Sequence, residues 1–142
     1  MYVITGATGH TGTVAADKLL ATGAKVRVIG RDAKRLERFT QKGAEAVVAD
    51  VTDAAGLEKA FSGARAVYAV MPPNLSAPDV RAYQERVTDS LASATRNSGI
   101  AYAVVLSSTG ADKSYGTRHE PKRLNDDYLG EQVLHEVAAA KG

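Results

Sequence analysis

The segment Val3–Gly12, Val-Ile-Thr-Gly-Ala-Thr-Gly-His-Thr-Gly, has the residue types and spacing to bind a diphosphate. A short apolar run ends at Gly6, and glycines recur at Gly9 and Gly12, where an apolar-periodic stretch begins. The first turn of a helix carries unpaired N–H groups, and glycines let a phosphate approach the backbone closely. The pattern predicts a strand, a glycine turn and a helix start that binds pyrophosphate. The alternative interpretation is a turn that binds no ligand, in which the glycines serve only to pack the strand tightly against the helix.

The polar residues inside this turn are Thr8, His10 and Thr11. Their backbone N–H groups would face the pyrophosphate, and the hydroxyl of Thr11 could join them. The side chain of His10 could equally face solvent and take no part. Together with the glycines, they complete the candidate set for the diphosphate: Gly6, Thr8, Gly9, His10, Thr11 and Gly12.

Arg31 is the candidate residue for choosing between dinucleotides. It follows a second apolar run, at the distance from the glycine turn where a ribose-binding residue is expected. An acid there would accept a hydrogen bond from the 2′-hydroxyl of NAD, whereas a guanidinium favours the 2′-phosphate of NADP. Arg31 could also be a solvated turn residue. Asp32 is better placed to cap the next helix, although a ribose contact from it would favour NAD.

Four ordered motifs resemble the NmrA-like branch of the atypical short-chain dehydrogenase/reductase superfamily. The resemblance spans residues 1–116 and implies a Rossmann fold with bound NADP(H), NAD being less favoured. The branch holds both reductases and catalytically silent redox sensors, so it implies no single reaction. The motifs are Gly6-Ala7-Thr8-Gly9-His10-Thr11-Gly12, Gly30-Arg31-Asp32, Val70-Met71-Pro72-Pro73 and Ser107-Ser108-Thr109-Gly110-Ala111.

Further cofactor contacts follow from the resemblance and from position. The resemblance implies adenine contacts at Asp50 and Val51, although Asp50 would also suit a helix cap. Met71 and Pro72 follow the fourth expected strand, and ligands of open α/β sheets bind beyond the carboxyl ends of strands. This loop is expected to cover the cofactor, with a plain exit turn as the alternative. Ser107 is expected to flank the nicotinamide end.

No catalytic residue is assigned, and Ser108 and Tyr128 are the only candidates. In many superfamily members a serine after the fifth strand hydrogen-bonds the substrate carbonyl, and a Tyr-x-x-x-Lys pair supplies the proton. The lysine lowers the tyrosine pKa. Here Gln132 stands where the lysine would be, and a neutral amide cannot favour a phenolate. Tyr128 is therefore interpreted as an ordinary helix residue.

Apolar runs alternate with helical periods and predict one α/β domain over residues 1–142, a doubly wound parallel sheet. Right-handed crossovers predict the strand order 3-2-1-4-5. Residues 117–142 form an atypical tail. Strands are expected over Tyr2–Thr5, Lys25–Ile29, Glu45–Ala49, Ala66–Val70 and Tyr102–Leu106, and helices over Thr11–Thr22, Ala33–Lys42, Ala54–Phe61, Asp79–Asn97 and Arg123–Ala140.

The chain ends at Gly142, before the part that supplies a sixth strand and a substrate cleft in the family. We expect a fragment, a site completed by a second chain, or a protein that works without a substrate. The strand Tyr102–Leu106 would be left at an edge, which favours a homodimer.

Composition excludes several functions. The net charge of +2 comes from charges of mixed sign, which does not suit nucleic-acid binding. There is no cysteine, and the three histidines lack metal-ligand spacing. No apolar run reaches the ~20 residues of a membrane span, so a cytoplasmic location is expected. A basic stripe of Lys34, Arg35, Arg38 and Lys42 is typical of a solvated helix face.

Two functions fit these observations. The first is an NADP(H)-dependent oxidoreductase that passes hydride to a quinone or another small acceptor. The second is a non-catalytic NADP(H) sensor that acts through a regulatory protein partner. Turnover with quinones would favour the first, and tight binding without turnover the second.

Overall fold

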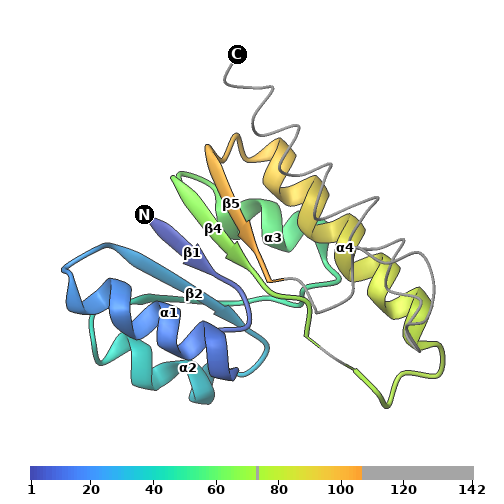
Figure 1. The fold of residues 1–142 in the computed structure, drawn as a ribbon, viewed down its shortest axis with the longest axis horizontal. Helices are drawn as coiled ribbons and strands as arrows, with labels where there is room; N and C mark the ends of the chain where they lie inside the picture. Colours follow the sequence, from blue (N-terminus) through green and yellow to red (C-terminus); the bar gives the residue numbers. More distant parts are fainter. Residues whose placement is uncertain (73, 107–142) are drawn as a thin grey trace.

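The computed structural model describes residues 1–72 and 74–106 as a parallel sheet with helices on both faces (Figure 1). Strands and helices alternate along the chain as the apolar periods predict. In chain order the elements are β1 (Tyr2–Ile4), α1 (His10–Ala21), β2 (Val26–Gly30), α2 (Ala33–Thr40), β3 (Glu45–Val48), α3 (Ala54–Phe61), β4 (Ala66–Ala69), α4 (Val80–Asn97) and β5 (Tyr102–Val105).

The strand order is β3-β2-β1-β4-β5, which confirms the predicted order. All neighbours pair in parallel, and β1 lies between β2 and β4, with Tyr2 opposite Val26 on one side and Ala66 on the other. The carboxyl ends of all the strands therefore meet at one edge of the sheet, called here the carboxyl edge. The glycine turn leaves the centre of this edge.

Each face of the sheet carries its own apolar core. Val3 and Ile4 are both buried, and because successive strand residues point to opposite faces, they enter different cores. One core packs β1 and β2 against α1 and α2, with Leu36 and Phe39 fully buried. The other packs the sheet against α3 and α4. Figure 1 shows these two helix pairs on opposite sides of the sheet.

Some predicted element ends differ from the observed ones by one or two residues. The predicted helix Ala33–Lys42 ends at Thr40, because Lys42 N–H already bonds to the carbonyl of Phe39, one residue nearer than in an α-helix. Gly43, with φ +93°, then turns the chain toward β3. The predicted tail helix, Arg123–Ala140, lies outside the described residues.

The last described strand, β5, pairs with β4 alone among residues 1–72 and 74–106. Val104 in this strand is 58% exposed, and Leu106, just after it, is 44% exposed. Among the described residues β5 is therefore an edge strand, as the sequence predicts. The homodimer that this edge favours remains a prediction. Within the described part of the chain, no helix combines the length and the apolar character needed to cross a membrane.

Candidate functional site

The start of α1 differs from the start of every other described helix. Asp32, Asp53 and Asp79 cap α2, α3 and α4, each accepting a backbone N–H at 2.9 to 3.1 Å. The N-cap of α1 is Gly9, which makes no side-chain cap bond. The first N–H groups of a helix need partners, and the helix dipole favours an anion there. The start of α1 can therefore accept an anion from outside.

The three glycines of the turn have different roles. Gly6 has φ +60°, a left-handed conformation that suits glycine, and its carbonyl accepts the N–H of Gly9 at 2.9 Å. Gly12 is buried, and a Cβ there would lie 2.3 Å from the oxygen of Gly6. Gly6 and Gly12 shape the turn from inside, whereas Gly9 is exposed at its surface.

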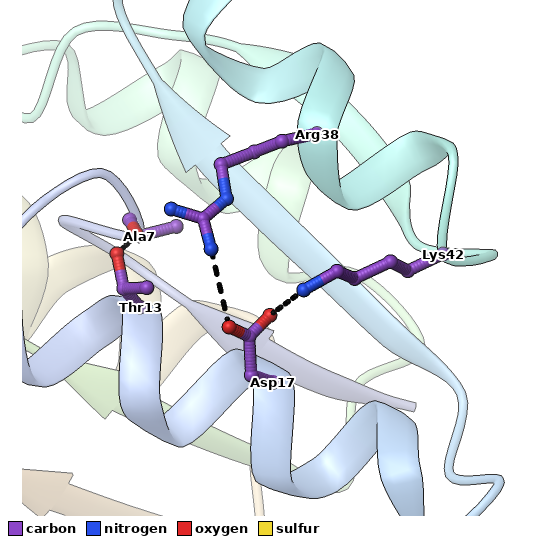
Figure 2. A network of polar contacts seen from close by, with 5 residues as sticks. All are labelled: Ala7, Thr13, Asp17, Arg38 and Lys42. Carbon is purple, nitrogen blue, oxygen red and sulfur yellow. Dashed lines mark hydrogen bonds and ion pairs between the residues drawn. The ribbon is translucent and has the colours of Figure 1, made fainter.

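The polar residues predicted for this site lie around the same helix start. His10 and Thr11 are exposed and belong to the first turn of α1, while Thr8 is half-buried in the loop before it. The hydroxyl of Thr13 donates to the carbonyl of Ala7 at 2.8 Å, which ties the loop to α1 (Figure 2). This hydrogen bond fixes the position of the loop relative to the first turns of α1.

A buried threonine brings the loop after β4 to the glycine turn. Thr5 is fully buried, and its Oγ1 accepts the N–H of Val70 at 2.8 Å. The backbone of Gly6 lies close to the side chain of Val70, since a Cβ on Gly6 would lie 3.3 Å from the Cβ of Val70. Met71 and Pro72 follow directly and are half-buried. The structure therefore brings this loop next to the predicted phosphate site.

Arg31 and Asp50 lie together at the carboxyl edge. The ends of β2 and β3 are neighbours, and the N–H of Ala49 donates to the carbonyl of Gly30 at 3.1 Å. Arg31 is exposed and makes no ion pair with the described residues. Asp32 caps α2 as predicted, with its carboxylate bound to backbone N–H groups. Arg31 is thus the residue with a free charged group at the end of β2.

The carboxylate of Asp50 is held by its own turn. It accepts the N–H of Thr52 at 2.8 Å and the hydroxyl of Thr52 at 2.7 Å. These two hydrogen bonds lower the pKa of Asp50, and the guanidinium groups of Arg31 and Arg86 lower it further. Val51 is buried in the core with α3 and α4, so Asp50 is the exposed member of the predicted adenine pair.

Arg86, on α4, is a residue that the sequence analysis did not select. It occupies an exposed position of a long helix, and helical periodicity alone does not show which neighbour an exposed side chain faces. Its electrostatic effect on Asp50 depends on how α4 packs beside α3, which only the tertiary structure shows.

The basic stripe on α2 is partly neutralised. Figure 2 shows the carboxylate of Asp17, on α1, between Arg38 and Lys42. The distances are 3.2 Å to Arg38 and 2.9 Å to Lys42. The Lys42 hydrogen bond, followed by the charges of both basic groups, lowers the pKa of Asp17. Two of the four basic side chains of the stripe are therefore paired with an acid of the same protein.

Several predicted positions lie outside the described residues. They include the candidates Ser107, Ser108 and Tyr128, and also Pro73 and Gln132. Within residues 1–72 and 74–106, no group of three histidine, aspartate or glutamate side chains could hold a metal ion.

Comparison with known proteins connects this geometry with a family. A family model described as NAD(P)H-binding matches residues 6–141, past the point where the NmrA-like motifs end. Cinnamoyl-CoA reductase 1 from Oryza sativa subsp. japonica is 33% identical over 139 residues, covering 92% of this chain and 39% of that protein.

Solved structures share the fold. The Citrobacter sp. triphenylmethane reductase complexed with NADP(H) has a TM-score of 0.73 at 18% identity, covering 99% of this chain and 46% of that one. An Escherichia coli NADPH-dependent quinone oxidoreductase complexed with NADPH has a TM-score of 0.65 at 21% identity, covering 99% and 45%. The chain thus spans less than half the length of these relatives.

Proposed function

The chain belongs to the NAD(P)H-binding family, and we propose that it binds NADP(H) at the carboxyl edge as the cofactor part of an oxidoreductase. The observation that carries this proposal is the start of α1. Among the described helices it is the one without a side-chain cap, and it follows the glycine turn. A pyrophosphate would satisfy its N–H groups and complement its dipole.

Each part of the site has a role in this proposal. The N–H groups of His10, Thr11 and Gly12 bind the pyrophosphate, and Gly9 leaves room for it. Arg31 binds the adenosine 2′-phosphate through charge-assisted hydrogen bonds. The remaining predicted contacts are adenine at Asp50 and Val51, and the nicotinamide end at Met71, Pro72 and Ser107.

The chemistry that bound NADPH supplies is hydride transfer to an acceptor. The chain's own contribution is to orient the dinucleotide with the residues above, since no general acid is assigned. We propose a quinone or another small molecule as the acceptor. The fold shared with a quinone oxidoreductase and a dye reductase is consistent with this choice. The finer assignment to the NmrA-like branch is supported by the four ordered motifs.

A non-catalytic NADP(H) sensor is the second candidate. One feature favours it: Gln132 occupies the position of the lysine that many superfamily members use for proton transfer. In that case the dinucleotide would change the affinity of the chain for a regulatory protein.

Calorimetric titration of the purified 142-residue chain with NADPH and NADH tests the proposal. We expect binding of both, with NADPH tighter. Steady-state oxidation of NADPH with a panel of quinones then separates the two functions. Turnover supports the oxidoreductase, and tight binding without turnover supports the sensor. If neither dinucleotide binds, both the oxidoreductase and the sensor proposals are wrong.

A further inference from the structure

Resting on the proposed function, we propose that Arg86 on α4 binds the adenosine 2′-phosphate of NADP(H) together with Arg31. Both guanidinium groups would contact the phosphate in the neighbourhood of Asp50. Arg31 comes from the end of β2, whereas Arg86 comes from a helix on one face of the sheet. The site would thus be built from elements that are more than fifty residues apart in the sequence.

The packing of α4 against α3 places Arg86 near the carboxyl edge. Near the end of α4, the side-chain N–H of Asn97 donates to Glu58 of α3 at 3.0 Å, so this side of α4 faces α3. Arg86 precedes Asn97 by eleven residues, which is about three helical turns, and lies on the same side. Three turns correspond to about 16 Å along the axis. Only four residues of α3, about 6 Å of helix, precede Glu58. Three turns of α4 therefore extend beyond the first residue of α3, and Arg86 lies beside the turn that precedes α3.

The turn before α3 includes the Asp50–Thr52 segment, and the buried core links this segment with α4. Tyr83 and Val87, on either side of Arg86 in α4, belong to the same buried cluster as Val51. The charge of Arg86 acts on the carboxylate of Asp50, as that of Arg31 does. Asp50 therefore lies within the electrostatic reach of both guanidinium groups.

The charges around Asp50 suit a phosphate monoester. The carboxylate is already bound to the N–H and hydroxyl of Thr52. Neither Arg31 nor Arg86 forms an ion pair within the described part of the chain, and both are exposed. Two guanidinium groups within electrostatic range of one carboxylate leave an excess of one positive charge. A phosphate monoester, with a charge of about −1.5 to −2 near neutral pH, complements this excess, whereas a ribose hydroxyl does not.

Titration of the full chain with NADPH and NADH tests this assignment. We expect Arg86→Ala to raise the Kd for NADPH about tenfold, the loss typical of one hydrogen bond to a charged group. The Kd for NADH should stay within about twofold, because NADH has no 2′-phosphate. Arg86→Lys keeps the charge and should recover part of the loss. Arg86→Ala should likewise raise the Kd for 2′,5′-ADP, which has the 2′-phosphate, and leave the Kd for 5′-AMP unchanged.

Arg65→Ala is the matched control. It removes the same charge from an exposed site just before β4, at the opposite edge of the sheet, and should leave both Kd values unchanged. An unchanged NADPH affinity in Arg86→Ala would overturn the inference, and so would an equal loss for both dinucleotides. In either case wild-type binding leaves the proposed function standing. If the wild-type chain binds neither dinucleotide, the proposed function fails and the inference fails with it.

Discussion

Gly12 faces the carbonyl of Gly6 so closely that a Cβ at this position would lie 2.3 Å from the oxygen and 3.0 Å from the Cα of Ala7. Both neighbours are backbone atoms and cannot rotate away. This contact fixes how α1 leaves the sheet, and therefore where its uncapped N–H groups point. Gly6, Gly9 and Gly12 are equally spaced in the sequence, but their roles differ: Gly12 is needed for packing, whereas Gly9 is exposed at the proposed phosphate site.

Gly12→Ala should destabilise the fold. The new methyl group must push the turn away from α1, and overpacking of this kind costs about 1–3 kcal/mol. Urea unfolding followed by circular dichroism measures the loss. Gly9→Ala is the control, because its Cβ would meet only the Gly6 oxygen, at 3.3 Å, and its φ of −85° suits any residue. Equal stability of the two variants would contradict the packing role of Gly12.

Gly9→Val should weaken dinucleotide binding, and it should destabilise the fold less than Gly12→Ala does. Gly9 is exposed at the start of α1, where a branched side chain would occupy the space for the pyrophosphate. We expect at least a tenfold rise in the Kd for NADPH by calorimetry, equivalent to about 1.4 kcal/mol. Ala21→Val, at the far end of the same helix, is the matched control. Unchanged affinity in Gly9→Val would remove the glycine turn from the site.

Thr5→Val should reduce stability and binding together. The substitution keeps the shape of the side chain but removes the oxygen that accepts the N–H of Val70. An unsatisfied buried N–H costs about 1–3 kcal/mol, and the glycine turn would lose its link to the loop after β4. Thr5→Ser retains the hydroxyl and should recover most of the binding. The serine variant behaving like the valine variant would mean that the methyl group, not the hydrogen bond, holds the two loops.

Arg31→Asp should shift the preference from NADPH toward NADH. Repulsion would replace a charge-assisted contact with the 2′-phosphate, while the new carboxylate could accept the 2′-hydroxyl of NADH. The ratio of the two Kd values is the measurement. Arg65→Asp makes the same charge change at the amino ends of the strands and serves as the control. A ratio that does not move would place Arg31 outside the site.

Acid unfolding should depend on Asp50. Its pKa is lowered in the folded chain by the Thr52 hydrogen bonds and then by Arg31 and Arg86. A lowered pKa contributes stability that is complete above the ordinary value of 3.8 and disappears as the pH falls through the lowered value. Asp50→Asn should therefore lose less stability than the wild type as the pH falls from 3.8 through the lowered value. Parallel pH curves for the two proteins would show that this turn does not titrate with folding.

The fold could be predicted because its signals are local. Apolar runs and helical periods give the order of elements, and Asp32 precedes an amphipathic stretch in the manner of a helix cap, which the structure confirms. The ends of elements were less predictable. α2 stops at Thr40 because its last turn tightens toward Gly43, and that geometry depends on the following strand.

The sequence by itself determined the alternation of strands and helices, the glycine turn and the position of Arg31, since each follows from residue types that are near one another in the chain. The strand order then follows from this alternation and from the right-handedness of crossovers. Only the tertiary structure decided which of these residues meet. The Thr5–Val70 bond joins positions 65 residues apart, and the electrostatic effect of Arg86 on Asp50 depends on the packing of α4 beside α3. Sheet register and helix packing arise from contacts distributed over the whole core. A local pattern therefore identifies candidate residues, and the three-dimensional packing determines the site that they form.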